Sequence, residues 1–251
     1  MIELRDDVRP LFGALAFEDW FRLEGRPAKV AANGRRRTIE LERGGRRFYL
    51  KTHEPVGWGE VLKCLASGKR PILGARAEVE ALEAARDLGL PAPRLAGWGV
   101  AGRGPAGQRS FVLTDALEVQ ARASDLRLPD LAPARRRRLT RALGHAVGSL
   151  HRAGWVHQDL YLEHVLLVAG TAEGLALVDL HRTLRPRLRG ERGRVKDLAA
   201  LLDSARRGGA TRADELAFLS AYAGRPPRDA RRELATRLAR VTRRSLSGKR
   251  A

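Results

Sequence analysis

The chain has 251 residues, a hydrophobic fraction of 43%, a single cysteine and a formal net charge of +19. This composition excludes a disordered chain and indicates a globular protein with one large domain or two lobes. One cysteine excludes an internal disulfide, and the sequence predicts no signal peptide and no membrane span, so we expect a cytoplasmic protein that is soluble or peripheral on a membrane. The charge indicates an anionic partner, such as nucleic acid, anionic lipid or an acidic protein. A generally basic, solvated surface is an equally weighted alternative.

The N-terminal third of the chain predicts a short lead-in followed by a β-meander. Residues 1–25 form an amphipathic pattern with several large apolar side chains. Two hairpin signals follow, Asn33-Gly34 and Gly44-Gly45. They separate three segments with strand character, 28–32, 37–42 and 46–51, so Lys51 is expected at the end of the third strand.

A predicted helix from about Ala75 to Leu88 carries an acidic residue on its apolar face. Glu78 lies near the middle of that face, while the other charged residues of the helix lie opposite. A carboxylate that points into a core needs a cation, because an unpaired buried charge is very costly. Lys51 is the cation that the meander offers, and a pair of this kind orients the phosphate-binding lysine of kinases.

The middle of the chain predicts the end of one lobe and the start of another. Two strands should flank the glycine-rich turn Gly102–Gly107, and Thr114–Leu117 is a candidate hinge over an adenine ring. A helix over Pro133–Ala153 follows, closed by Gly154.

Further helices are expected at Val195–Ala205, Thr211–Ala223 and Pro227–Leu246. Asp197 would lie in the first turn of the first of these. There it would serve either the helix's own amide groups or a catalytic loop, and the sequence does not favour one role over the other.

The stretch Trp155–Val168 carries the most informative pattern. His157, Asp159 and His164 precede an apolar run, and a second apolar run ends at Asp179. Kinases place two carboxylates in this way, one to accept the proton of the acceptor hydroxyl and one to hold Mg²⁺. The alternative is a turn with a capping aspartate and two ordinary core histidines.

Several other classes of site lack their motifs. The sequence has no P-loop, no paired cysteines, no H-E-x-x-H and no G-x-S-x-G, and the one G-x-G-x-x-G match, at Gly102, opens no predicted helix. Aromatic residues are only 5% of the chain, so base stacking is poorly supplied and no nucleic-acid partner is expected.

Three segments resemble the lipopolysaccharide core heptose kinases of the Kdo/WaaP family. They are H-E-P-V-G-W-G-E and its continuation to Glu80, H-Q-D-L-Y-L-E-H-V-L-L, and V-D-L-H-R followed by K-D-L-A-A-L. The resemblance covers roughly residues 25–204. It implies an α+β, protein-kinase-like fold, with an N-lobe at 1–115 and a mainly helical C-lobe at 116–251. It also implies transfer of the ATP γ-phosphate to a heptose hydroxyl of the inner core, on the cytoplasmic face of the inner membrane.

The same resemblance suggests a role for each candidate residue. Asp159 would be the catalytic base and His157 a further catalytic residue. Asp179 would be the main Mg²⁺ ligand, with His164 at the position of a second. Lys51 would contact the ATP phosphates with Glu78 as its partner. The nucleotide side would also include Asn33, Gly34 and Thr114. His181 and Arg182 lie where the acceptor could be contacted.

Partners and alternatives follow from the same resemblance. The implied partners are the lipopolysaccharide core with its lipid A, the anionic membrane surface and an acyl carrier protein. Another kinase on the same scaffold, acting on Kdo, a small molecule or a protein, remains an alternative. A non-catalytic relative that binds an anionic partner is another, since no glycine-rich loop precedes Lys51. A nucleic-acid-binding module has the support of charge alone.

Overall fold

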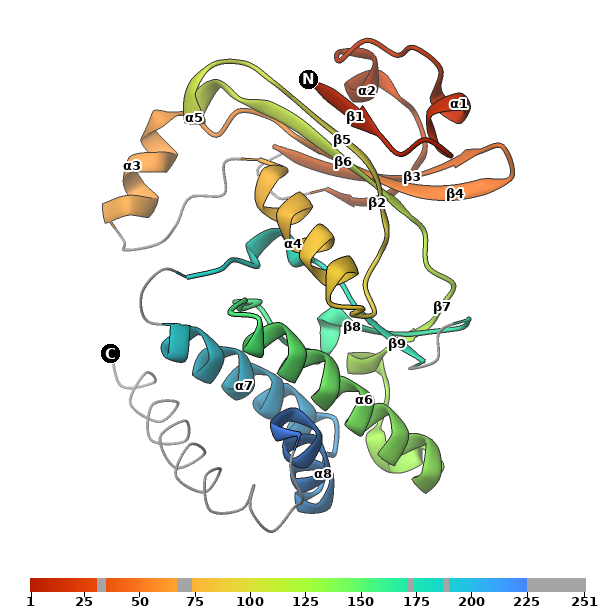
Figure 1. Cartoon of the computed structure of the whole chain (residues 1–251), viewed down its shortest axis with the longest axis vertical. Helices are drawn as coiled ribbons and strands as arrows, with labels where there is room; N and C mark the ends of the chain where they lie inside the picture. The colour runs from red at the N-terminus through yellow and green to blue at the C-terminus, as the bar shows by residue number, and fades with distance from the viewer. Residues whose placement is uncertain (31–34, 67–73, 171–173, 187–189, 225–251) are drawn as a thin grey trace. The chain divides into compact units, whose positions relative to one another are not determined.

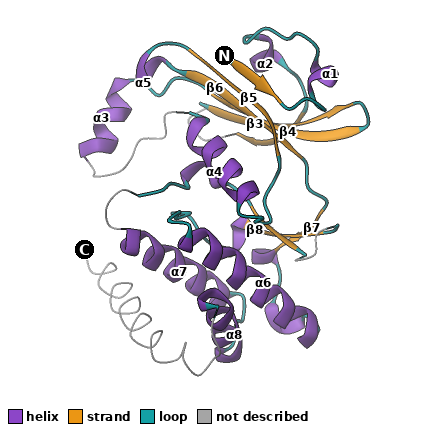
Figure 2. Ribbon diagram, in the orientation of Figure 1, coloured by secondary structure: helices purple, strands orange, loops and turns teal. Residues whose placement is uncertain are grey.

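The computed structural model describes residues 1–30, 35–66, 74–170, 174–186 and 190–224. Its contacts divide the chain into two compact units, the first made of residues 1–84 and 93–116, the second of residues 85–92 and 117–251. Figure 1 labels the elements of both units, and Figure 2 shows that strands dominate the first and helices the second. No helix in the described part of the chain is long and apolar enough to cross a membrane.

The first unit contains a six-stranded antiparallel sheet with the order β1-β5-β6-β4-β3-β2. Its strands are β1 (Ile2–Leu4), β2 (Arg26–Val30), β3 (Arg36–Arg43), β4 (Arg46–His53), β5 (Leu95–Ala101) and β6 (Arg109–Asp115). The predicted meander is confirmed as β2-β3-β4, in which β3 and β4 pair from Arg36↔His53 to Arg43↔Arg46. The Asn33-Gly34 turn lies outside the described residues. Lys51 lies within β4, which continues to His53.

The predicted lead-in is part of the core of the first unit. It forms β1 and two short helices, α1 (Arg9–Phe12) and α2 (Asp19–Arg22). The rings of Trp20 and Phe111 stack with centroids 4.3 Å apart, and Phe12 packs against both Trp20 and Phe48. Aromatic packing of this kind buries large areas of apolar surface, so this segment stabilises one face of the sheet.

Three helices complete the first unit: α3 (Trp58–Ala66), α4 (Arg76–Asp87) and the single turn α5 (Gly104–Gly107). The helix α4 confirms the prediction to within one residue at each end, and Gly89 beyond it has a φ of +62°. The glycine-rich turn between β5 and β6 folds as α5, because its Pro105 lies at the start of the turn, where proline is tolerated. The helix α4 lies on the face of the sheet opposite to α1 and α2 (Figure 1).

In the second unit, the described residues form a small antiparallel sheet and three helices. The sheet has the order β7-β8-β9, formed by Val119–Arg122, Val165–Val168 and Leu175–Leu177. The helices are α6 (Pro133–Arg152), α7 (Gly190–Arg207) and α8 (Arg212–Ala223). Single 3₁₀ turns lie at Ala123–Asp125, Leu128–Asp130, Leu162–His164 and Leu180–Arg182. The two apolar runs between His164 and Asp179 form the short strands β8 and β9, as predicted.

The helix α7 corrects one boundary. The apolar pattern predicted a start at Val195, but the helix begins at Gly190, so Asp197 lies well inside it. The additional residues, Gly190 to Arg194, carry no apolar periodicity that would have indicated a helix. Within this added turn, Gly193 packs against Val156. A Cβ at this position would lie 2.9 Å from a methyl carbon of Val156, so glycine allows the close approach. The expected helix Pro227–Leu246 lies outside the described residues.

Candidate functional site

In the first unit, β4 and α4 bring together the predicted lysine and glutamate. Side chains alternate along β4, so Phe48 and Leu50 point into the aromatic core while Lys51 points to the α4 side. Its Nζ lies 2.6 Å from Oε1 of Glu78. The side chain of Glu78 is 7% exposed and that of Lys51 20%. A charge-assisted hydrogen bond this short and this sheltered holds the ammonium group in one place.

One carboxylate oxygen of Glu78 is not hydrogen-bonded to any described residue. This oxygen, Oε2, is buried. A buried acceptor without a donor is destabilising, and such groups are often found where a protein binds a ligand or works catalytically. The Lys51–Glu78 pair is therefore a candidate part of a functional site.

The other residues predicted on the nucleotide side are less informative. Thr114 lies on β6, in register with Tyr49 of β4 and with Leu95 of β5, where the pairing of β6 with β5 ends. Asn33 and Gly34 lie outside the described residues, so their roles remain predictions.

In the second unit, the segment that follows α6 is hydrogen-bonded to α7. Gly154, with a φ of +86°, ends α6, and Val156 then pairs with Leu184 through two backbone hydrogen bonds of 2.9 and 3.0 Å. The backbone N–H of His157 donates to Oδ2 of the fully buried Asp197 at 2.6 Å. Of the two roles expected for Asp197, the structure therefore shows the contact to the histidine segment and not a cap of its own helix.

His157 is fully buried. Its Nε2 donates to the carbonyl oxygen of Val178 at 3.2 Å, which ties this segment to the residue before Asp179. Burial lowers the pKa of His157, and nearby His164 lowers it further, so the ring is neutral in the folded protein. A side chain without solvent access does not touch a substrate, so the geometry gives His157 a positioning role in place of the direct catalytic role expected.

Asp159 and Asp179 lie in one cluster with two further histidines. The side chain of Asp159 is 27% exposed and that of Asp179 20%. His164 connects the two segments, since its Nδ1 donates to the carbonyl oxygen of Asp159 at 2.6 Å while its Nε2 lies 3.6 Å from Oδ2 of Asp179. Asp179 is further held by Nδ1 of His181, which donates to its Oδ1 at 2.5 Å.

The backbone of this cluster is unusual at two positions. Gln158 and Asp179 have φ angles of +67° and +62°, and they are the only non-glycine residues with positive φ in the described part of the chain. The left-handed conformation is unfavourable for residues other than glycine and tends to occur at functional sites. Both residues adjoin or include the carboxylates that the sequence singled out.

Asp179 offers a carboxylate oxygen of the kind that Mg²⁺ binds, and its role as the principal ligand stays a prediction. Nε2 of His164 and Oδ2 of Asp179 face each other at 3.6 Å. Carboxylate oxygen suits Mg²⁺ well and imidazole suits it poorly, and Mg²⁺ usually takes only one or two carboxylates alongside phosphate and water. Among the described residues no three His, Cys, Asp or Glu side chains are arranged to hold a metal by themselves.

The two residues predicted as acceptor contacts, His181 and Arg182, differ in accessibility. His181 is buried, so its ring serves to fix Asp179. Arg182 is half exposed, and its Nη1 lies 3.7 Å from Oδ2 of Asp159. Arg182 therefore remains available to a substrate, whereas His181 does not.

Sequence reasoning missed two residues that support the cluster. His151, on the buried face of α6, donates from Nε2 to Oδ2 of Asp197 at 3.2 Å, and its Nδ1 lies 3.0 Å from the hydroxyl of Tyr222 on α8. The spacing of four residues from Val147 to His151 placed this ring on the apolar face of the helix. Nothing in the sequence indicated Tyr222, because its contact joins helices far apart along the chain.

Comparisons with known proteins give a consistent result. The family model described as "Lipopolysaccharide kinase (Kdo/WaaP) family" matches residues 18–222. A Pseudomonas aeruginosa protein named lipopolysaccharide core heptose(I) kinase WaaP is 37% identical over 84% of this chain and 82% of its own. An Escherichia coli protein of the same name is 31% identical over 91% and 89%. A solved structure titled "WaaP in complex with acyl carrier protein" superposes with a TM-score of 0.76 at 32% identity, covering 98% of both chains.

Proposed function

Because the chain belongs to the lipopolysaccharide kinase (Kdo/WaaP) family, we propose that it transfers the γ-phosphate of ATP to a heptose hydroxyl of the lipopolysaccharide inner core. Use of ATP follows from membership of a kinase family. The heptose acceptor is supported by the relatives, which are heptose(I) kinases by name. The observation that carries the proposal is that Asp159 and Asp179 lie in one partly exposed cluster, joined through His164.

Each charged group has a task in this reaction. Asp159 accepts the proton of the attacking hydroxyl, and Arg182, whose Nη1 lies 3.7 Å from Oδ2 of Asp159, faces the acceptor. Lys51, held by Glu78, contacts the phosphates of ATP. Asp179 would hold the Mg²⁺ that accompanies ATP, and the ion, when bound, offsets negative charge on the phosphates.

The histidines hold this arrangement together. His181 occupies one oxygen of Asp179 and so directs the other toward His164. His157 and Asp197 fix the backbone just before Asp159. Positioning matters because a misplacement of about 1 Å can cost a hundredfold in rate.

The test is transfer of labelled γ-phosphate from ATP with Mg²⁺ to dephosphorylated lipopolysaccharide core. We expect Asp159→Asn to lower the rate by about 10²–10⁴-fold, the usual effect of losing a positioned base. Glu78→Gln should lower it by about 10–100-fold, since a hydrogen bond to a charged group contributes about 1.5–3 kcal/mol. Asp130→Asn and Glu80→Gln, at exposed carboxylates, are the matched controls.

The results of this assay distinguish a core heptose kinase from a kinase with another acceptor and from a non-catalytic relative. Wild-type transfer that survives Asp159→Asn would remove Asp159 as the base. ATP binding without transfer to core would mean a different acceptor, and a protein that does not bind ATP would be a non-catalytic relative.

We further propose that an acyl carrier protein is a partner of this chain. The solved relative was captured with such a protein, according to its title. The net charge of +19 supports the same conclusion, because an acidic protein would be attracted to it.

A further inference from the structure

The short helix α3 exposes an apolar face. Trp58, Leu62 and Leu65 are 61%, 61% and 58% exposed, and their spacing of four and three residues puts them on the same side of the helix. Val61, on the flank of this face, is buried and attaches the helix to the first unit. The helix also packs beside α5. The apolar face is therefore presented outward by a helix that is itself anchored.

This exposure is concentrated in one place. Large hydrophobic side chains are exposed at six positions in the described part of the chain, and three of the six lie on this nine-residue helix. Apolar residues scattered singly on a surface need no explanation, but a contiguous patch marks a binding surface. Tryptophan adds a further indication, because its ring has an apolar body and a polar N–H and favours the boundary between membrane and water.

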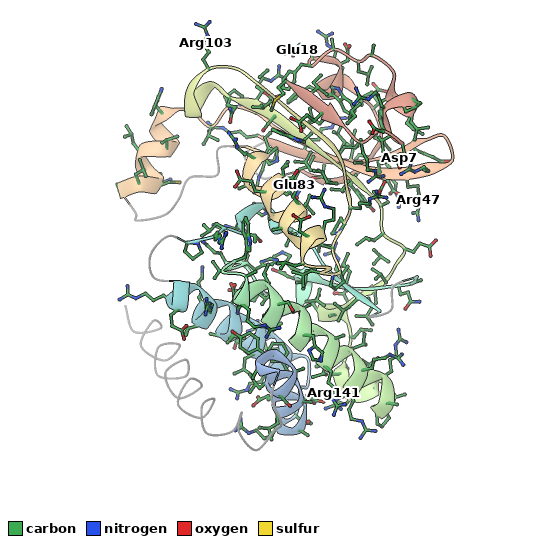
Figure 3. The ribbon with its side chains drawn as sticks, in the orientation of Figure 1. Asp7, Glu18, Arg47, Glu83, Arg103 and Arg141 are labelled. Carbon is green, nitrogen blue, oxygen red and sulfur yellow. The ribbon has the colours of Figure 1, made fainter. Side chains whose placement is uncertain are left out.

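Basic side chains lie on α3 and beside it. Lys63 is on α3 itself and is exposed. Arg103, in the turn that leads into α5, is exposed and points away from the ribbon (Figure 3). An apolar helix face with basic residues on it and beside it matches an anionic lipid surface, which attracts nearby Lys and Arg side chains.

We propose that α3 is an interfacial helix that inserts Trp58, Leu62 and Leu65 into an anionic phospholipid bilayer. The proposal rests on the proposed function for its purpose, since it names the surface on which a lipid-linked acceptor would be met. Partial insertion suits the dimensions, because a helix of nine residues is about 13 Å long and can lie flat in the headgroup region. A second copy of the chain fits less well. Three side chains expose a few hundred Å² at most, and a stable interface takes about 800 Å² from each partner.

The test measures binding to vesicles by co-sedimentation. One set contains phosphatidylethanolamine with phosphatidylglycerol, and the other phosphatidylcholine alone. We expect the wild type to bind the anionic vesicles, and Leu62→Ser/Leu65→Ser to bind them at least tenfold more weakly, given the transfer free energy of two leucine side chains. Val119→Ser changes an exposed apolar residue of the second unit and should bind like the wild type.

Fluorescence reports on insertion directly. Tryptophan emission should shift to the blue when anionic vesicles are added, and Trp58→Phe should remove that shift while leaving the signals of the other three tryptophans. The proposal is overturned if the double variant binds vesicles like the wild type. It is also overturned if the wild type is a dimer that the double variant converts to monomer while vesicle binding is unchanged.

The proposed function is tested separately in the same preparations. Phosphate transfer to core oligosaccharide stripped of acyl chains needs no membrane, so Leu62→Ser/Leu65→Ser should retain it, and Asp159→Asn should lose it while still binding vesicles. Vesicle binding that depends on α3 in a protein without core kinase activity would support this inference and reject the proposed function.

Discussion

Four histidines of the second unit form hydrogen bonds within and around the segments that carry Asp159 and Asp179. His157 and His164 bridge the segments to each other, His181 fixes Asp179, and His151 reaches Asp197. A neutral imidazole suits such positions, because one ring nitrogen donates a hydrogen bond and the other accepts one. Of these four histidines, His157 is the one whose burial lowers its pKa.

We predict that His157 makes stability depend on pH below about 6.5. Burial lowers its pKa in the folded protein, so below the unfolded value of 6.5 the unfolded chain binds a proton that the native state does not. The free energy of unfolding therefore falls as pH falls, by at most about 1.4 kcal/mol per pH unit for one group.

Urea unfolding of the wild type and of His157→Phe between about pH 7.5 and pH 5.5 measures this contribution. The variant should show a shallower decline than the wild type, whatever its stability at pH 7.5. His145→Phe, at an exposed histidine of α6, is the control and should leave the slope unchanged. Parallel slopes for wild type and His157→Phe would show that another group is responsible.

At the scale of elements, the packing of α6 against α8 depends on two glycines one turn apart. A Cβ at Gly144 would lie 2.5 Å from the carbonyl oxygen of Phe218, and one at Gly148 would lie 2.5 Å from that of Tyr222. Backbone atoms do not move aside as a flexible side chain does. The two helices can therefore approach this closely only with glycine at both positions, and this approach brings Tyr222 to His151.

We predict that Gly148→Ala destabilises the protein by about 1–3 kcal/mol, the typical cost of overpacking a close contact. Gly59→Ala is the matched control, because Gly59 is also helical but has open space around its Cβ position. It should be neutral or raise stability by about 0.5–1 kcal/mol, since alanine favours helix more than glycine does. Thermal unfolding monitored by circular dichroism distinguishes the two, and equal midpoints would contradict the packing argument.

At the scale of the whole molecule, the chain is a strongly basic α+β protein with the protein-kinase-like fold of its family. Its first unit holds the Lys51–Glu78 pair, and its second unit holds Asp159 and Asp179. The net charge of +19 acts on partners over a distance that salt controls, about 10 Å at 0.1 M ionic strength.

The charge leads to a prediction about the proposed carrier-protein partner. Binding to an acyl carrier protein, measured by surface plasmon resonance, should weaken at least tenfold between about 0.05 M and 0.5 M salt, mainly through slower association. An unrelated protein of similar acidity is the control and should bind much more weakly at each salt concentration. Equal binding of both proteins would show a nonspecific charge effect and reject the partner proposal.

The sequence by itself determined the elements and most of the candidate residues. Hairpin glycines located the meander, and helical periodicity placed Glu78 on a buried face, which required a nearby cation and so indicated Lys51. The order of Asp159, two apolar strands and Asp179 could likewise be inferred from one short stretch of the sequence. Patterns of this kind follow from the geometry of a single helix or strand, so one sequence is enough to read them.

Only the tertiary structure decided what those residues do to one another. Asp197 lies inside α7 and braces His157, His181 fixes Asp179 instead of facing the acceptor, and Tyr222 supports His151 across the pair of helices. Each of these contacts joins segments that are distant along the chain or depends on a left-handed backbone angle at Asp179. Contacts of that kind arise from packing, and the local pattern of residues does not contain them.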